Sequence, residues 1–106
     1  MQHVTSYTEF SDILLSSEAV LLYVSSPGCS VCHALLPQVK ALMQEFPYVK
    51  MVYANTGIAP DIAGQLTVFS VPAVLFFLKS RERFRVVRFV PIGGLRESIT
   101  NALKII

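Results

Sequence analysis

Two cysteines and a histidine form the cluster whose residue types and spacing are most typical of chemistry. Cys29 and Cys32 are separated by Ser30 and Val31, and His33 follows directly. A dithiol at this spacing can exchange disulfides, bind a metal ion or attach haem. For exchange the reactive species is the thiolate, so the surroundings of each sulfur decide its reactivity.

The segments around the dithiol favour thiol–disulfide exchange. Residues 20–24 form an apolar run typical of a strand buried on both faces, and residues 25–28 have turn chemistry. A helical pattern then covers residues 29–46. Cys29 is therefore expected at a helix N-terminus, where free N–H groups and the helix dipole stabilise a thiolate. Cys32, one turn later on the same side, can attack a mixed disulfide formed at Cys29.

Haem attachment and zinc binding are the competing interpretations. Cys29, Cys32 and His33 match the c-type haem motif, which would require export machinery and usually an axial partner; a Soret band would reveal it. The same three residues could bind zinc with His3 as a distant fourth ligand. Structural zinc sites normally present two ligand pairs, and a closed site here would require dimerisation. We expect neither a cofactor nor a native metal.

His33 and Ser30 are the candidate modulators of the cysteine pKa values. His33 is expected in the first helical turn, where it is either a neutral neighbour of the dithiol or, when protonated, lowers a cysteine pKa. Ser30 lies between the two cysteines, where side chains bear on dithiol geometry and thiolate stabilisation.

The remaining pattern predicts a single α/β domain over residues 1–106. Expected helices cover residues 8–17, capped by Ser6 or Thr8, then 59–66 and 95–106; expected strands cover 3–4, 51–54, 73–78 and 84–90. The order (β)αβαβαββα predicts parallel strand pairs, with an antiparallel hairpin through a turn at 79–83. The phenylalanines and the tyrosines at 48 and 53 are assigned to the core and the sheet faces.

The chain resembles the thioredoxin family over nearly its whole length. The dithiol follows an apolar strand, Pro37 lies five residues beyond Cys32 where thioredoxins carry a helix-kinking proline, and Val71-Pro72 directly precedes a hydrophobic strand. A closing strand pair and helix complete the pattern. The resemblance implies a three-layer fold with a central mixed sheet of four to five strands. It also implies that Cys29 attacks and Cys32 resolves.

The resemblance further implies a substrate-positioning role for Val71 and Pro72. Thioredoxins have a cis-proline at this place, facing the dithiol. We therefore expect a cis bond before Pro72, although trans is the rule for such bonds. The N–H and C=O of Val71 would then be offered to an incoming peptide, as in strand addition.

Several residues depart from the family pattern. Gly28 stands where a tryptophan is usual, Ser30-Val31 replace Gly-Pro, and Tyr23 takes the place of a buried acidic residue six positions before Cys29. A phenol with a reference pKa near 10 is a poor proton acceptor at neutral pH. The proton of Cys32 is then expected to leave through water or His33, which predicts slower or more specialised exchange.

The rim of the predicted site is also expected to differ from that of other thioredoxins. Pro27, Val31, Val71 and Phe69 are the candidate apolar residues that contact substrate or form a dimer. The segment 91–94, Pro-Ile-Gly-Gly, shifts the glycine that many thioredoxins place before the last helix.

Composition excludes several other classes of protein. Hydrophobic residues make up 53% of the 106 positions, enough for a core, and the net charge of +2 is too small to argue for nucleic acid or a membrane surface. Basic residues at 79, 81, 83, 85 and 88 are interpreted as an exposed strand and turn, with Arg81, Arg83 and Arg85 alternating on the solvent face. The start lacks a secretory signal pattern, so we expect a cytoplasmic protein.

The sequence thus predicts a thiol–disulfide oxidoreductase that reduces protein disulfides through Cys29 and Cys32. A thioredoxin reductase or a low-molecular-weight thiol would supply electrons, and the chain would be a monomer or a weak homodimer. The alternative is a binding or redox-sensing module in which the cysteine pair signals to a partner without general turnover. Tyr23 and Gly28 are the features that favour this alternative.

Overall fold

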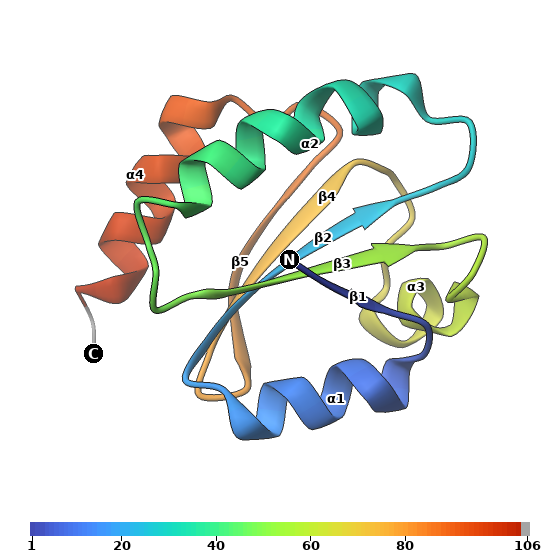
Figure 1. Ribbon diagram of the computed structural model, residues 1–106, viewed down its shortest axis with the longest axis horizontal. Coiled ribbons are helices and arrows are strands. Elements are labelled where there is room, and N and C mark those ends of the chain that lie inside the picture. Colours follow the sequence, from blue (N-terminus) through green and yellow to red (C-terminus); the bar gives the residue numbers. More distant parts are fainter. Residues whose placement is uncertain (105–106) are drawn as a thin grey trace.

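The computed structural model describes residues 1–104, and the predicted end of the last helix at 105–106 lies outside them (Figure 1). The predicted order of helices and strands is confirmed. The elements are β1 (Gln2–Val4), α1 (Tyr7–Ser16), β2 (Ala19–Ser25), α2 (Ser30–Met43), β3 (Lys50–Asn55), α3 (Pro60–Leu66), β4 (Ala73–Leu78), β5 (Arg81–Val87) and α4 (Ile92–Leu103). Ser6 is the cap of α1, with its hydroxyl accepting from the Glu9 N–H.

The five strands form one mixed sheet in the order β1-β3-β2-β4-β5. β1, β3 and β2 are parallel, whereas β4 is antiparallel to both β2 and β5. The expectation of parallel pairs outside the last hairpin was therefore wrong for β4. The seven residues of α3 span only about 10 Å, whereas a six-residue strand is about 20 Å long. The loops on both sides of α3, 56–59 and 67–72, lie at the edge where β3 ends, so β4 enters the sheet there and runs back.

Helices cover both faces of the sheet, which gives three layers (Figure 1). α1 and α3 pack on one face, against a core that includes Val20, Leu22 and Val24 of β2. α2 and α4 pack on the other, where β2 contributes Leu21 and Tyr23. Every residue of β2 is buried, as its continuous apolar sequence predicted.

The β4–β5 hairpin turns earlier than the sequence indicated. Lys79 and Ser80 form a two-residue turn with φ of 51° and 67°, so β5 begins at Arg81 and ends at Val87 instead of covering 84–90. Positive φ at both positions is what a type I′ turn requires, and Asn-Gly is its usual sequence. Lys-Ser carries no such signal, which is why the predicted turn was too long.

A β-bulge also corrects the predicted face of the basic residues. Phe84 pairs with Phe76 but Glu82 pairs with Phe77, so Arg83 is an extra residue in β5. The bulge shifts the alternation, and Arg85 comes to share a face with Glu82 instead of with Arg81.

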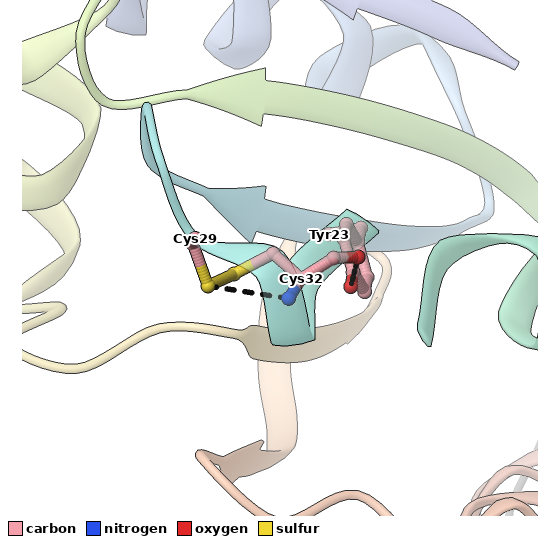
Figure 2. Close-up of a disulfide and its surroundings, with 3 residues drawn as sticks. All are labelled: Tyr23, Cys29 and Cys32. Carbon is pink, nitrogen blue, oxygen red and sulfur yellow. Dashed lines mark hydrogen bonds between the residues drawn. A yellow bond between two sulfur atoms is a disulfide. The ribbon is translucent and has the colours of Figure 1, made fainter. Parts of the chain in front are cut away.

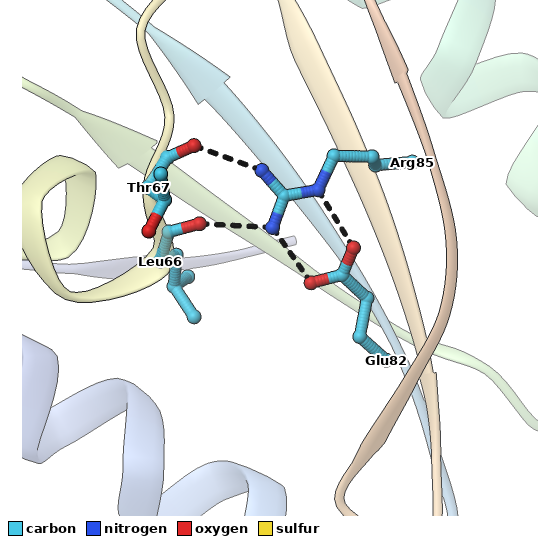
Figure 3. Close-up of polar contacts among 4 residues, drawn as sticks. All are labelled: Leu66, Thr67, Glu82 and Arg85. Atoms are coloured by element: carbon cyan, nitrogen blue, oxygen red, sulfur yellow. Dashed lines mark hydrogen bonds and ion pairs between the residues drawn. The ribbon is translucent and has the colours of Figure 1, made fainter.

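Arg85 ties β5 to the end of α3 (Figure 3). Its guanidinium forms a two-pronged ion pair with Glu82 through two N···O distances of 2.7 Å. It also donates to the carbonyl oxygens of Leu66 at 2.8 Å and Thr67 at 3.0 Å. These carbonyls end α3, where a cation is favoured, and they begin the segment that leads to Pro72.

Replacing Arg85 with lysine should therefore loosen this segment. An ammonium group cannot reproduce four directed contacts, so we expect Arg85→Lys to lower the free energy of unfolding by about 1 kcal/mol, since the site is partly exposed. Amide exchange at residues 68–71 should accelerate. Arg81→Lys, on the same strand, is the matched control; equal effects of the two variants in denaturant titration would contradict this role.

Candidate active site

The sheet topology brings four loops to one edge. β2 and β3 end side by side, with Ser25 opposite Asn55, and β4 begins beside the end of β2, with Ala73 opposite Val24. β5 ends there too, because Val87 pairs with Ala73. The loops 26–29, 56–59, 67–72 and 88–91 therefore gather at the carboxyl end of β2, and the dithiol and Pro72 lie on the same edge.

Cys29 and Cys32 form a disulfide at the start of α2, with their Cα atoms 5.3 Å apart (Figure 2). Cys29 is the N-cap residue, as predicted, and its Sγ accepts a hydrogen bond from the Cys32 N–H at 3.2 Å. Cys29 is half-buried, whereas Cys32 is 1% exposed. The more accessible sulfur is thus the one that lies at the positive end of the helix.

The first turn of α2 is suited to hold an anion on Cys29. The Cys32 N–H already points at its Sγ, and the first turn carries no acidic residue. Both the free N–H group and the helix dipole stabilise negative charge on the sulfur. Ser30 and His33 are exposed in this turn, and the His33 backbone N–H donates to the Cys29 carbonyl at 3.2 Å. Pro37 lies further along α2, at the position that the resemblance implied.

The bond between Val71 and Pro72 is cis, as expected. Pro72 is buried, and its carbonyl accepts a hydrogen bond from the Arg88 N–H at 2.7 Å. Val71 is half-buried, and within residues 1–104 no hydrogen-bond partner is found for its N–H or C=O. An unpaired N–H and C=O at a sheet edge can accept an added strand.

The rim around this edge is more apolar than the sequence analysis foresaw. The rim candidates Val31 and Phe69 are exposed, at 59% and 89%, and so is Pro27; the assignment of Phe69 to the core was therefore wrong. Phe89 was assigned to the core but is 80% exposed, because β5 ends before it. Ile58, on the 56–59 loop, and Val87, the last residue of β5, are also exposed and apolar. The sequence analysis named neither of them as a rim residue. Tyr48, also assigned to the core, is 93% exposed.

Gly57 allows the 56–59 loop to pack against the loop that precedes the dithiol. A Cβ atom on Gly57 would overlap the ring of Pro27. The Thr56 N–H donates to the Ser25 carbonyl at 2.9 Å, and the Gly57 N–H donates to Asn55 Oδ1 at 2.8 Å. The sequence signal was the short Asn-Thr-Gly segment, which was interpreted only as the end of a strand.

The described part of the chain offers no preformed metal cluster. Among residues 1–104, no group of three His, Cys, Asp or Glu side chains is placed to hold a metal ion. His3, the distant zinc ligand considered above, packs against the ring of Tyr53 with centroids 4.8 Å apart. Within the same residues, no helix is long and apolar enough to cross a membrane.

Tyr23 is fully buried and lies next to Cys32 (Figure 2). Its hydroxyl donates to the Cys32 carbonyl at 2.6 Å, which ties the middle of β2 to the first turn of α2. Burial, with a smaller contribution from the stacked Tyr53, raises the pKa of Tyr23 to about 12. At neutral pH the phenol is therefore a hydrogen-bond donor and no proton acceptor. The sequence identified the missing acid but not this hydrogen bond.

Removing the Tyr23 hydroxyl should change the free energy of unfolding by an amount that depends on pH. At pH 8 we expect Tyr23→Phe to be about 1 kcal/mol less stable, since a buried carbonyl loses a partner. Because the pKa of Tyr23 is raised from 10 to about 12, the phenol ionises in the unfolded chain before it ionises in the folded one, so the wild type loses stability as the pH rises from 10 to 12. Tyr23→Phe lacks this loss.

The difference between the two proteins should therefore shift by on the order of 2 kcal/mol in favour of Tyr23→Phe between pH 10 and pH 12. Denaturant titrations at several pH values measure it, and Tyr48→Phe, at an exposed tyrosine, is the control for phenol ionisation in general. A difference that stays constant with pH would contradict the assignment.

Comparison with known proteins places the chain in a family. The family model described as Thioredoxin matches residues 1–101. Thioredoxin-like protein YdfQ of Bacillus subtilis is 30% identical over 99% of this chain and 94% of that protein, and Thioredoxin 1 of Synechococcus elongatus is 33% identical over 94% of both. The crystal structure of oxidized mitochondrial thioredoxin 3 from Saccharomyces cerevisiae has the same fold, with a TM-score of 0.87 over 95% of this chain and 94% of that chain at 20% identity. With its disulfide-bonded Cys-x-x-Cys pair at the start of α2, the chain belongs to the thioredoxin family.

Proposed function

We propose that this protein is a thiol–disulfide oxidoreductase that reduces protein disulfides through Cys29 and Cys32. The observation that carries the proposal is the disulfide at the start of α2, with one half-buried sulfur and one fully buried sulfur. Family membership supports disulfide exchange as the class of reaction. No organic cofactor is required, since the cysteine pair itself carries the two electrons.

The reaction has two steps. The Cys29 thiolate attacks one sulfur of the substrate disulfide, forms a mixed disulfide and releases the first substrate thiolate. The Cys32 thiolate then attacks Cys29 Sγ, forms the Cys29–Cys32 disulfide of this structure and releases the second substrate thiolate. Two electrons pass to the substrate, and both released thiolates take up protons from solvent. A second dithiol or two small thiols reduce the Cys29–Cys32 disulfide again.

Tyr23 stands where the family has a buried acidic residue, and it cannot accept the proton of Cys32 at neutral pH. Its hydroxyl is a donor, fixed on the Cys32 carbonyl. We assign the proton to solvent water that enters on the Cys29 side, with the exposed His33 as the second candidate acceptor. This route predicts slower resolution than a buried carboxylate would allow, and it suits a specialised set of substrates.

Val71 and Pro72 are proposed to position the substrate chain. The N–H and C=O of Val71 have no partner within residues 1–104, so an extended peptide can pair with them as an added strand. Ser30 and His33 are proposed to modulate the cysteine pKa values from the first turn of α2.

A reducing compartment suits this cycle, because turnover requires that the disulfide be reduced again. We propose the cytoplasm as its location, with a thioredoxin reductase or a low-molecular-weight thiol as the electron donor. The protein is proposed to act as a monomer or a weak homodimer, without nucleic acid or membrane partners.

Turnover is tested with insulin as the protein disulfide and dithiothreitol as the electron donor. The wild type should accelerate reduction at least about tenfold over the uncatalysed rate, because the second step is intramolecular. Cys29→Ser should return the rate to the uncatalysed level. Equal rates for the wild type and Cys29→Ser would sink the proposal.

Trapping tests the roles of the two sulfurs. Cys32→Ser should accumulate a stable mixed disulfide at Cys29, because nothing remains to resolve it. Cys29→Ser should form little adduct, since Cys32 is 1% exposed. Mass spectrometry of peptides from both variants measures the adducts. Predominant trapping at Cys32 would reverse the assigned roles.

A redox-sensing module is the second candidate function. The observation that favours it is the hydrogen bond from Tyr23 to the Cys32 carbonyl. In an enzyme, a base at this position would speed the deprotonation of Cys32, and Tyr23 is no such base. A module of this kind would form the Cys29 adduct in the trapping experiment and reversibly bind a partner, yet would not accelerate insulin reduction. The two experiments together therefore separate the candidates.

A further inference from the structure

Arg88 is a cation on the 88–91 loop, at the edge of the sheet where the dithiol lies. It follows β5 directly and is exposed. Its backbone N–H donates to the Pro72 carbonyl at 2.7 Å, so its position is fixed relative to the segment that is proposed to hold the substrate chain.

The backbone at Arg88 is unusual for a residue with a side chain. Its φ is 70°, in the left-handed region that favours glycine. A strained residue that persists next to a reactive group points to a use for its side chain. Glycine would adopt this backbone more easily but would offer no charge.

A groove connects Arg88 with the first half of α2, the helix that begins at the dithiol. It lies between the first half of α2 and the segment after β5, and its lining includes Val31, Leu35, Arg88, Phe89 and Ile92. Val31 lies between the two cysteines in the sequence, so the groove reaches the turn of α2 that carries them. Its walls are apolar apart from Arg88 and Gln38, so the guanidinium is the one charged group that residues 1–104 place on them.

Within residues 1–104, no carboxylate side chain forms an ion pair with Arg88. The seven acidic residues are Glu9, Asp12, Glu18, Glu45, Asp61, Glu82 and Glu97. None of them lines the groove, and the ion pairs found within residues 1–104 join Glu82 to Arg85 and Glu45 to Arg96. Arg88 therefore offers an unpaired positive charge to whatever enters the groove.

We propose that this groove selects protein disulfides that carry an acidic residue within one or two positions of the cysteine attacked by Cys29, with Arg88 pairing the substrate carboxylate. The inference rests on the proposed function and names its substrate class. The mixed disulfide fixes the substrate cysteine at Cys29, so its sequence neighbours must lie along the rim. A guanidinium suits this task, since it pairs with a carboxylate through two parallel hydrogen bonds.

The test uses three disulfide peptides that differ in one residue next to a cysteine, which is Glu, Gln or Lys. We expect the wild type to reduce the Glu peptide about fivefold faster than the Lys peptide in kcat/KM, with the Gln peptide between them. The preference should shrink as the salt concentration rises, because salt screens the pair.

Variants of Arg88 identify the source of the preference. Arg88→Gly suits the left-handed backbone and should bring the ratio of the Glu to the Lys peptide near one. Arg88→Glu should invert the ratio. Arg81→Glu makes the same change in net charge at the far end of β5 and should keep the wild-type ratio. An unchanged ratio in Arg88→Glu, or an equal change in Arg81→Glu, would overturn the inference.

Two results distinguish a failure of this inference from a failure of the proposed disulfide-reducing function. If the wild type reduces all three peptides equally and faster than Cys29→Ser does, only the selectivity by Arg88 is overturned. If the wild type reduces none of them faster than Cys29→Ser, the proposed function fails and the inference fails with it.

Discussion

The structure depends most on β2, a strand that is buried on both faces and hydrogen-bonded on both sides. All seven of its residues are buried, and β3 and β4 pair with its two edges. A strand held in this way has little freedom to move, so the point where it ends is fixed. The dithiol follows four residues after Ser25, on the first turn of a helix that packs on the same strand. The position of the two sulfurs is therefore set by β2, the most constrained strand of the fold.

The burial of β2 also explains the hydrogen bond and the raised pKa of Tyr23. A hydroxyl in the middle of β2 needs a partner, and the Cys32 carbonyl supplies it at 2.6 Å. A carboxylate in this place would hold or release a proton near neutral pH, whereas the buried phenol, with its pKa raised to about 12, holds its proton throughout. The protein has a rigid link next to Cys32 where it could have had a base. The hydrogen bond from Tyr23 fixes the first turn of α2, but the phenol cannot take the proton of Cys32. This site is therefore compatible with both an enzyme and a redox sensor.

Features set by local chemistry were predictable from the sequence, and features set by pairing were not. The apolar run of β2, the cap at Cys29 and the cis bond before Pro72 followed from composition, spacing and family resemblance. The direction of β4 depended on the path of residues 56–72 over the sheet, which their sequence does not specify. The bulge at Arg83 depended on the register against Phe76 and Phe77, and it alone decided which face Arg85 occupies. The exposure of Phe89 followed in turn from where β5 ends.

Backbone conformation around the dithiol distinguishes positions that serve the fold from positions that serve recognition. Gly28, with φ of 75°, and Gly57, whose missing Cβ admits Pro27, let the backbone turn and approach closely, and a side chain at either place would work against the loop. Arg88 has nearly the same φ as Gly28 but carries the longest cationic side chain. The backbone at Arg88 is thus satisfied best by glycine, and its hydrogen bond to the Pro72 carbonyl needs only an N–H. Neither requirement accounts for arginine, which is why we infer that its guanidinium acts on a bound substrate.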